Sequence, residues 1–432
     1  MRIVDLIDKK REGGRHSREE LEAIVGGYVQ DAVPDYQIAA WLMAVCWRGM
    51  GADELADLTQ VMAASGTRLD LSSIGRPVAD KHSTGGVGDK TSLVVMPLVA
   101  ACEVPVGKMS GRGLGFTGGT IDKLESFPGI RLDLDAAAFV RQLREVGMVI
   151  TGQSADLAPA DGKLYALRDV TGTVPSLPLI ASSIMSKKLA AGAEVIVLDV
   201  KTGSGAFMRE PDGARALARA MVDIGVAAGR RMAAVVSDMS QPLGRAVGNA
   251  LEVAEALDTL EGHGPPELTE FATDLATLTA ELASDGAVGR ADVEDALRSG
   301  RGTRMFRRMV EAQGGDTRAF DDRGRLPRAG TQRVVVAETD GYLARLDALT
   351  VAHASTELGA GRERKGDAID LSVGTVLQSK VGDRVVCGQP LAILHANDVA
   401  RAERAEQLLR LAIAISPEEV APPPLVLERI SG

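Results

Sequence analysis

Two glycine-rich stretches of the sequence combine the residue types that bind a small anion. The first, DKHSTGGVGDKTS, covers residues 80–92, and the second, SGRGLGFTGGTIDKLES, covers residues 110–126. Glycine lets successive backbone N–H groups turn toward an anion, and lysine and hydroxyl side chains add further donors. Ser92 begins an apolar helical run, and the N-terminal end of a helix favours negative charge. Two such loops facing each other would form a socket for one free phosphate ion.

The same side-chain types recur in or beside both stretches. The candidate anion ligands are the lysines and hydroxyl groups of Lys81, Ser83, Thr84, Ser92, Lys108, Ser110 and Thr120. His82 follows a lysine directly, so a neighbouring cation should hold its pKa at or below the usual value. A lone histidine is often a packing residue, but inside a phosphate loop His82 is a candidate acid or hydrogen-bond donor. Tight turns at strand ends would explain either loop alone, and the repeated chemistry favours an anion site.

Two familiar nucleotide-binding motifs do not fit these loops. A P-loop requires a glycine directly before its Lys-Ser/Thr pair, but Asp89 stands at that place. Residues 113–118 match G-x-G-x-x-G, and Asp135 lies about where a ribose-binding acid would fall. However, Pro-Gly at residues 128–129 interrupts the following helix too early for a dinucleotide-binding crossover. Neither motif is therefore predicted here.

A second set of polar residues lies on two consecutive predicted helices. Tyr165 and Arg168 are spaced i and i+3, so both project from one helix face. Ser183 and Lys187 are spaced i and i+4 within the otherwise apolar segment LPLIASSIMSKKL. These donors would suit a neutral planar ligand that has carbonyl oxygens and a ring N–H. The alternative is a solvated helix face on which the arginine and lysine stems cover apolar surface.

The elements that must position these residues fall into three kinds. Residues 1–65 show helical apolar spacing, and Ser17 and Glu20 have the spacing of a capping box. From about residue 70, short apolar runs alternate with helical patterns, which indicates a largely parallel α/β sheet. Beyond about residue 330, short alternating strands and turn signals follow one another. Residues 158–192 interrupt the α/β pattern with two helices that have no strand between them.

We therefore predict an α/β protein with a small all-helical domain and a C-terminal α+β, β-sandwich-like domain. The helical domain comprises residues 1–65 and 158–192, the α/β phosphate-binding domain residues 70–157 and 193–330, and the C-terminal domain residues 331–432. The chain then crosses between the first two domains three times. A ligand cleft is expected between the helical and α/β domains, because clefts form preferentially between domains.

Composition excludes several classes of partner. The net charge is −10, and lysine and arginine are scattered, which gives no electrostatic footprint for nucleic acid. The cysteines Cys46, Cys102 and Cys387 lie far apart and suggest neither a disulfide framework nor a zinc site, so a reducing cytoplasm is expected. No apolar run is long enough to span a membrane, and the N-terminus lacks the features of a signal peptide.

Five motifs of the chain resemble those of the thymidine and pyrimidine-nucleoside phosphorylases. They are DKHSTGGVGD, SGRGLGxTGGTIDKLE, APADxxLYALRDVT, SSIMSKKLA and DVKTGSGAFM, and the resemblance covers essentially the whole chain. It implies reversible phosphorolysis of uridine, thymidine or deoxyuridine, which yields the free base and an α-pentose 1-phosphate. It also implies inorganic phosphate as co-substrate, no organic cofactor and a homodimer. A strict thymidine phosphorylase and a nucleoside-binding protein without turnover are the alternatives.

The resemblance also assigns roles to the candidate residues. It places phosphate against Lys81, Ser83, Ser92, Ser110 and Thr120, and we add His82, Lys108 and Met109 to that side. It places the base against His82, Arg168, Ser183 and Lys187, with Tyr165 beside them. The catalytic residues would be His82, Arg168 and Lys187, which would stabilise the negative charge of the departing base.

Two positions depart from the family pattern. Phe116 stands where many relatives have histidine, which puts in doubt a polar role for that loop position. Lys90 stands where relatives that bind a potassium ion have a small hydroxyl residue. The other residues of that implied ion site are unchanged in type: Gly88, Leu243, Ala246 and Glu255. Either the Lys90 ammonium reaches Glu255 and serves as an internal cation, or it points to solvent while the Lys90 carbonyl ligates the metal.

Overall fold

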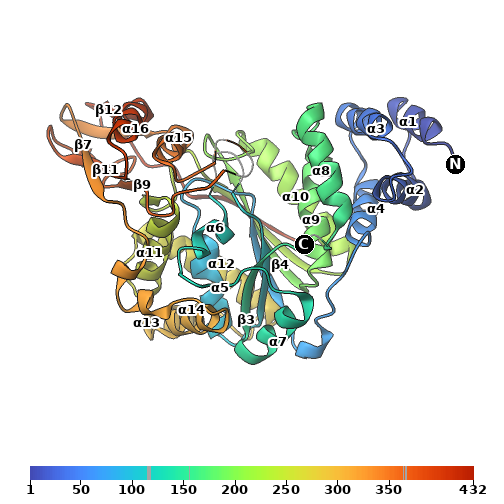
Figure 1. The fold of residues 1–432 in the computed structure, drawn as a ribbon, viewed down its shortest axis with the longest axis horizontal. Helices are drawn as coiled ribbons and strands as arrows, with labels where there is room; N and C mark the ends of the chain where they lie inside the picture. Colours follow the sequence, from blue (N-terminus) through green and yellow to red (C-terminus); the bar gives the residue numbers. More distant parts are fainter. Residues whose placement is uncertain (114–117, 155, 363, 365–366) are drawn as a thin grey trace.

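The computed structural model describes residues 1–113, 118–154, 156–362, 364 and 367–432. Within these ranges a six-stranded sheet forms the centre of the molecule, in the order β13-β5-β4-β1-β2-β3 (Figure 1). Its parallel strands are β1 (Ala79–Ser83), β2 (Val106–Ser110), β3 (Met148–Gly152), β4 (Val195–Thr202) and β5 (Arg231–Asp238). The predicted, largely parallel α/β sheet is therefore confirmed.

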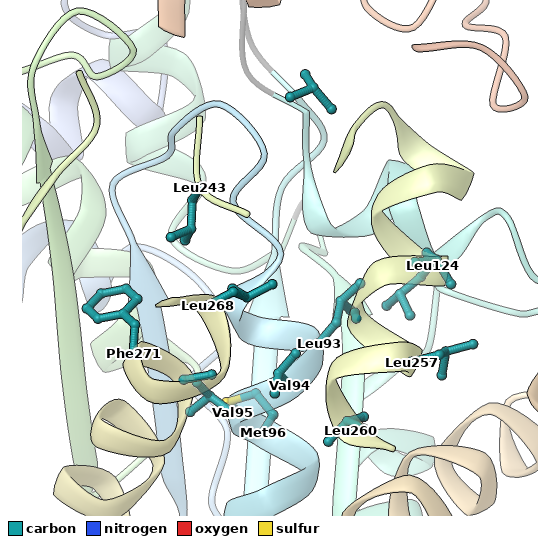
Figure 2. Close-up of a cluster of buried hydrophobic side chains, with 14 of the residues drawn as sticks. Leu93, Val94, Val95, Met96, Leu124, Leu243, Leu257, Leu260, Leu268 and Phe271 are labelled. Atoms are coloured by element: carbon teal, nitrogen blue, oxygen red, sulfur yellow. The ribbon is translucent and has the colours of Figure 1, made fainter. Parts of the chain in front are cut away.

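Both faces of this sheet are covered by helices. β4 is buried at every position, and alternate side chains point to opposite faces of a strand. Accordingly, Val197 belongs to one hydrophobic core and Leu198 to another. Figure 2 shows the first core, where α5 (Thr91–Ala101) lies among α11 (Asn249–Leu260) and α12 (Pro266–Ala283). The second core lies beneath α7 (Ala136–Val146), α9 (Leu177–Ala190) and α10 (Pro211–Ala227).

A helical unit lies at one end of the molecule (Figure 1). It contains α1 (Ile3–Arg11), α2 (Arg18–Val29), α3 (Asp35–Arg48), α4 (Ala52–Ala63) and α8 (Pro159–Thr171). The predicted capping box of α2 is present: Ser17 accepts from the Glu20 N–H, and the Glu20 carboxylate accepts from the Ser17 N–H. Leu164 of α8 and Leu179 of α9 join the core of this unit, whereas Met185 of α9 joins the second core of the sheet. Helix α9 therefore packs on both the helical unit and the sheet.

The C-terminal part of the chain is α+β, as predicted. It contains β7 (Thr331–Val336), β8 (Gly341–Leu346), α15 (Ala348–Leu358), β9 (Gly374–Leu377), β10 (Arg384–Val385), β11 (Pro390–Ala396), α16 (Val399–Ala412) and β12 (Ile413–Ser416). These strands form a sheet in the order β10-β8-β12 and a sheet in the order β6-β9-β11-β7, the latter including β6 (Ala246–Val247). The remaining elements are η1 (Ser72–Ile74), α6 (Thr120–Leu124), α13 (Arg290–Arg298), α14 (Arg301–Ala312), η2 (Thr317–Phe320) and η3 (Arg323–Arg325).

Two strands cross the predicted division into domains. β13 (Val426–Ser431) returns to the large sheet and runs antiparallel to β5, although its residues were assigned to the C-terminal domain. β6 leaves the α/β part and pairs with β9 of the C-terminal part. A short apolar strand carries no local signal for its pairing partner, so the sequence did not reveal either exchange. The domain boundaries otherwise stay predictions. Among the described residues, no helix combines the length and apolar character that a membrane crossing requires.

Candidate functional site

The two glycine-rich stretches leave neighbouring strands at the same edge of the large sheet. β1 ends at Ser83 and β2 at Ser110, and the two strands are parallel neighbours. The first stretch leads into α5, whose second residue is Ser92. The second leads into α6, whose first residue is Thr120. Ligands of open α/β sheets bind at this carboxyl edge, so the fold brings both stretches to a plausible ligand position.

Two lysines of the strands are buried beneath these loops. Lys81 Nζ lies 2.5 Å from Thr91 Oγ1 and 3.2 Å from a carboxylate oxygen of Asp199 on β4. Lys108 Nζ donates to the carbonyl oxygen of Lys81 at 2.6 Å. Both lysines were predicted from the sequence, whereas Asp199 and Thr91 were not. Since a buried ammonium requires a partner, the Asp-x-Lys pattern of the buried strand β4, from Asp199 to Lys201, is the signal that could have revealed Asp199.

A carboxylate lies inside the first glycine-rich stretch. The Ser83 hydroxyl donates to the side chain of Asp89, and Thr91 Oγ1 donates to Asp89 Oδ1 at 2.6 Å. Burial acts to raise the pKa of Asp89, but the ammonium groups of Lys201, Lys81 and Lys123 outweigh it and hold the pKa well below the usual value. Asp89 is therefore ionised. A phosphate that bound here would have to replace this carboxylate as the acceptor of the Ser83 hydroxyl.

The charges of the two predicted sites meet at His82. Burial lowers the pKa of His82 well below its usual value, and the largest additional effect comes from the ammonium of Lys188. Lys108, Lys81 and Lys187 lower it further. Two of these lysines belong to the strands and two to α9. The imidazole is therefore neutral near pH 7, in the direction expected from the sequence. Its Nε2 atom is enclosed and has no hydrogen-bond partner among the described residues.

Lys188 joins α9 to the sheet. Its Nζ donates to Asp80 Oδ2 on β1 at 2.7 Å and to the Met109 carbonyl oxygen on β2 at 3.0 Å. Lys108 Nζ lies 3.7 Å from the other oxygen of the same Asp80 carboxylate. One buried carboxylate thus faces two ammonium groups from different elements. The contact of Met109 with this network is through its backbone oxygen, and the sequence analysis missed both Asp80 and Lys188.

The four residues predicted on the paired helices make local contacts. The Arg168 guanidinium is buried and donates to the carbonyl oxygens of Thr173, Val174 and Leu179 at 3.3, 2.8 and 2.9 Å. Its Cζ lies 5.7 Å from the ring centroid of Tyr165. A guanidinium has five N–H donors, and contacts among the described residues use three of them and leave two.

Ser183 and Lys187 on α9 lie beside a carboxylate that was not predicted from the sequence. Lys187 Nζ lies 2.5 Å from Asp161 Oδ2, 2.5 Å from the Ser183 carbonyl oxygen and 3.2 Å from Ser183 Oγ. Asp161, Tyr165 and Arg168 follow one another at i, i+4 and i+7 along α8, which is the spacing of one helix face. That spacing could have revealed Asp161 before the structure was known.

The Lys90 side chain points inward. Its Nζ donates to the carbonyl oxygens of Leu243 and Ala246 at 3.0 and 2.8 Å and to the Glu255 carboxylate. Gly88 lies beside the Lys90 ammonium. A Cβ built at Gly88 would lie 3.5 Å from Lys90 Nζ and 2.7 Å from the Leu243 carbonyl oxygen. The ammonium therefore contacts the oxygens that the implied potassium site would use. The described residues contain no group of three or more histidine, cysteine, aspartate or glutamate side chains placed to hold a metal.

A cavity of about 790 Å³ opens beside the ends of β2 and β3. It is lined by Ser110, Arg112, Asp133, Gln153 and Ser154, among others, and of the predicted site residues only Ser110 borders it. This cavity therefore adjoins the carboxyl edge of β2 but does not bring the predicted residues together. Phe116 lies outside the described residues.

The chain matches three family models. The model described as "Glycosyl transferase family, helical bundle domain" covers residues 4–66, and "Glycosyl transferase family, a/b domain" covers residues 75–303. "Pyrimidine nucleoside phosphorylase C-terminal domain" covers residues 342–416.

Similar proteins of known name span the whole chain. The chain is 50% identical to a pyrimidine-nucleoside phosphorylase of Geobacillus stearothermophilus, with 100% of both chains covered. It is 52% identical to a pyrimidine-nucleoside phosphorylase of Staphylococcus aureus, with 92% of each chain covered. Among solved structures, the anthranilate phosphoribosyltransferase of Thermus thermophilus is similar in fold, with a TM-score of 0.59 at 20% identity over 71% of this chain and 98% of that chain.

Proposed function

The chain belongs to the pyrimidine-nucleoside phosphorylases, and on that premise we propose how its residues divide the reaction between a phosphate side and a base side. It is a pentosyltransferase that carries out phosphorolysis of pyrimidine nucleosides, with inorganic phosphate as co-substrate. The observation that carries the division of roles is the contact of α9 with the strands beside His82, where Lys188 donates to Asp80 on β1 and to the Met109 carbonyl oxygen on β2.

The phosphate side lies at the carboxyl ends of β1 and β2. Phosphate is bound there by Lys81, Ser83, Ser92, Ser110 and Thr120, with His82, Lys108 and Met109 beside it. Support comes from the glycine-rich loops at one sheet edge and from Ser92 and Thr120 in the first turns of α5 and α6. Helix N-termini and cationic groups both favour a bound anion. Asp89 leaves the Ser83 hydroxyl when the phosphate enters, because both compete for one donor.

The base side lies on α8 and α9. Arg168, Ser183 and Lys187 donate to the carbonyl oxygens of the pyrimidine, and Tyr165 flanks them. Support comes from the two N–H donors that Arg168 retains and from the contact of Lys187 with Ser183, which holds both groups on one face of α9. A pocket built to pair a ligand's polar groups rejects ligands that leave them unpaired. Asp161 keeps the Lys187 ammonium oriented.

The proposed mechanism breaks the bond between C1' and N1 of the nucleoside and forms a bond between C1' and a phosphate oxygen. As the glycosidic bond lengthens, positive charge grows on the sugar and the bonding electron pair moves onto the base, which takes up the proton that hydrogen phosphate loses on forming the ester. His82, Arg168 and Lys187 stabilise that negative charge. Phosphate, held in line on the opposite face, attacks C1', so positioning supplies much of the acceleration. No protein nucleophile takes part.

A potassium ion does not fit the residues of this chain, and we assign no step of the reaction to it. Support comes from the Lys90 ammonium, which donates to two carbonyl oxygens and one carboxylate of the implied ion site. A lysine ammonium carries the same single charge as potassium and three donors for three acceptors. Lys90 thus serves as an internal cation that joins the loop after β1 to the segment before α11.

A homodimer and a cytoplasmic location complete the proposal. Trp47 and Tyr36 on α3 are 83% and 73% exposed, and Val170 on α8 is 79% exposed. Exposed apolar groups on adjoining helices mark a protein interface, and the fitting partner is a second copy of the chain. Sedimentation equilibrium measures this, and a monomer at micromolar concentration would contradict it. Cys46, Cys102 and Cys387 are all unbridged, which supports a reducing compartment.

The substrate range distinguishes this proposal from its alternatives. Lys108 lies beside the phosphate lysine Lys81, and its ammonium would tolerate a ribose 2'-OH as a hydrogen-bond partner. We therefore expect turnover of uridine, thymidine and deoxyuridine, each saturable in phosphate. Initial rates for the three nucleosides at increasing phosphate concentration provide the test. Turnover of thymidine and deoxyuridine without uridine would indicate a strict thymidine phosphorylase, and binding without turnover would indicate a nucleoside-binding protein.

A further inference from the structure

A buried carboxylate, Asp122, connects the described residues on the two sides of the second glycine-rich stretch. It is the third residue of α6 and is 0% exposed. Its Oδ2 accepts the Gly113 N–H at 2.6 Å, and its Oδ1 accepts Arg112 Nη1 at 3.2 Å. Asp122 therefore fixes the start of the loop, at Gly113, relative to α6, which begins with Thr120.

A further partner of Asp122 comes from the C-terminal part of the chain and contacts both carboxylate oxygens. Arg362 Nη2 donates to Asp122 Oδ1 at 2.8 Å, and Arg362 Nη1 donates to Asp122 Oδ2 at 3.1 Å. This is a two-pronged guanidinium–carboxylate contact, which fixes orientation as well as distance. The Arg362 side chain is 19% exposed, so solvent screens the pair only in part.

The segment that carries Arg362 is anchored a second time. It follows α15, and the carbonyl oxygen of Ala360 accepts from Asn249 Nδ2 at 2.9 Å. Asn249 is the first residue of α11, next to the sheet. A rigid helix and a second hydrogen bond thus hold the arginine in place. The Arg362 contact is therefore built into the fold and is not a chance meeting of two surface charges.

The neighbour of Asp122 ties the two glycine-rich stretches together. Lys123 Nζ donates to the Asp89 carbonyl oxygen at 2.7 Å and to the Gly118 carbonyl oxygen at 3.1 Å, and it lies 3.0 Å from Glu252. Helix α6 therefore holds the first stretch through Lys123 and the second stretch through Asp122. A shift of α6 would therefore move its contacts with Asp89, Gly113 and Gly118 together.

From these contacts we propose that Arg362 is a positioning residue for phosphate, acting through Asp122 on the second loop. The C-terminal part of the chain thereby contributes to the reaction without touching the reactants. This inference rests on the assignment of the second loop to phosphate binding. Loss of the guanidinium would let Asp122 shift together with Gly113 and Thr120, and a misplaced positioning group weakens binding and reaction of the group that it orients.

The test compares Arg362→Gln with wild type in full steady-state kinetics. We expect the KM for phosphate to rise at least about tenfold, while the KM for uridine at saturating phosphate changes less than about twofold. Arg404→Gln is the matched control, because Arg404 pairs with Glu357 at 2.7 Å within the C-terminal part and contacts no described residue of either loop. The control should keep both KM values. An unchanged KM for phosphate in Arg362→Gln, or an equal rise in both KM values, would overturn the inference.

Two further variants make the test independent of general damage to the fold. Arg362→Lys keeps one charge and one point of contact, so its KM for phosphate should lie between wild type and Arg362→Gln. Arg362→Gln added to Asp122→Asn should cause no further loss, because the arginine acts through that carboxylate. Additive losses would contradict the inference. If the wild-type enzyme itself did not saturate with phosphate, the proposed function would fail instead, so the two failures are distinguishable.

Discussion

At the scale of single residues, Lys108 is an ammonium group whose pKa lies close to neutral pH. Burial is the main cause that lowers its pKa to about 7 from the ordinary 10.5, and the ammonium of Lys188 adds to it while Asp80 opposes. Between about pH 7 and about pH 10.5 the unfolded chain holds a proton that the folded chain lacks. The free energy of unfolding therefore rises with pH across that window. It falls as the pH is lowered toward 7, because burying the charged form of Lys108 destabilises the folded state.

The same titration predicts a pH dependence of phosphate binding. Above about pH 7 Lys108 loses the charge that attracts phosphate, so the KM for phosphate should rise in wild type between about pH 6 and about pH 8.5. Lys108→Met cannot titrate and should show a flatter profile. Since the titration of phosphate itself is common to both proteins, the ratio of their KM values isolates the lysine. Parallel profiles would show that Lys108 does not act on phosphate.

Lys81 and Arg168 should fail differently when each is replaced by alanine. Lys81→Ala should mainly raise the KM for phosphate, and Arg168→Ala should mainly lower kcat/KM for uridine. Each should lose about 2 to 4 kcal/mol of transition-state stabilisation. Arg168→Ala should also lower the thermal midpoint, because its guanidinium holds three backbone carbonyl oxygens. Near-normal kcat/KM for uridine in Arg168→Ala would refute the base-side assignment.

The residue types of the site were predictable, but their partners were not. Glycine, lysine and hydroxyl side chains in one loop suggest an anion, and this pattern led to Lys81, Ser83 and Thr120. The roles of Asp89 and Asp80 as partners of these side chains were not predicted, because anion ligands are sought among cations and hydroxyl groups. A carboxylate partner is expected only when the lysines are known to be buried, since a buried ammonium without a carboxylate is costly. A short motif does not show which of its side chains are buried.

At the scale of elements, α9 connects the two predicted sides of the site. It packs on the helical unit and on the sheet, and Lys188 fastens it to Asp80 and to the Met109 carbonyl oxygen. We refer to these two contacts of Lys188 as the joint between α9 and the sheet. The position of Lys187 relative to the phosphate loops therefore depends on this joint. The sequence predicted α8 and α9 as consecutive helices, and the structure confirms both. The joint itself could not be predicted, because it depends on which strand the helix meets.

Lys188→Met tests the joint. The variant leaves Asp80 with one ammonium instead of two, and we expect the free energy of unfolding to fall by about 3 kcal/mol. The pKa of His82 should rise toward its usual value, since the Lys188 ammonium has the largest effect of the nearby charges that lower this pKa. Proton NMR titration of the five histidines measures this shift. Lys163→Met is the control, because Lys163 pairs with Asp31 on the helical unit. A His82 titration that stays unchanged in Lys188→Met would contradict the role of the joint.

At the scale of the whole molecule, two lysines from different parts of the chain hold the segment before α11. Lys90 donates to the Leu243 and Ala246 carbonyl oxygens, and Lys380 of the C-terminal part donates to the Gly244 carbonyl oxygen at 3.0 Å. The arrangement of the three units was predictable from changes in the apolar pattern along the sequence. The exchanges of β6 and β13 between the sheets were not, because pairing between distant strands depends on the assembled fold.

The internal cation predicts that the enzyme does not depend on potassium. Replacing potassium by a large organic cation at constant ionic strength should change the thermal midpoint and kcat of wild type little. Lys90→Thr should make both respond to potassium, because it removes the ammonium and leaves the oxygens of Leu243, Ala246 and Glu255. Lys90→Met fills the space with an apolar chain and should be less stable in either salt. A wild-type enzyme that loses most of its activity without potassium would refute this account.

The central claim is that phosphate, held by the loops after β1 and β2, attacks the sugar of a pyrimidine nucleoside. Its most direct test is a ³¹P NMR measurement of the purified protein with uridine and inorganic phosphate. We expect a new pentose 1-phosphate resonance that grows in step with uracil, and no uracil in phosphate-free buffer. Release of uracil together with free ribose, or at an equal rate without phosphate, would contradict it.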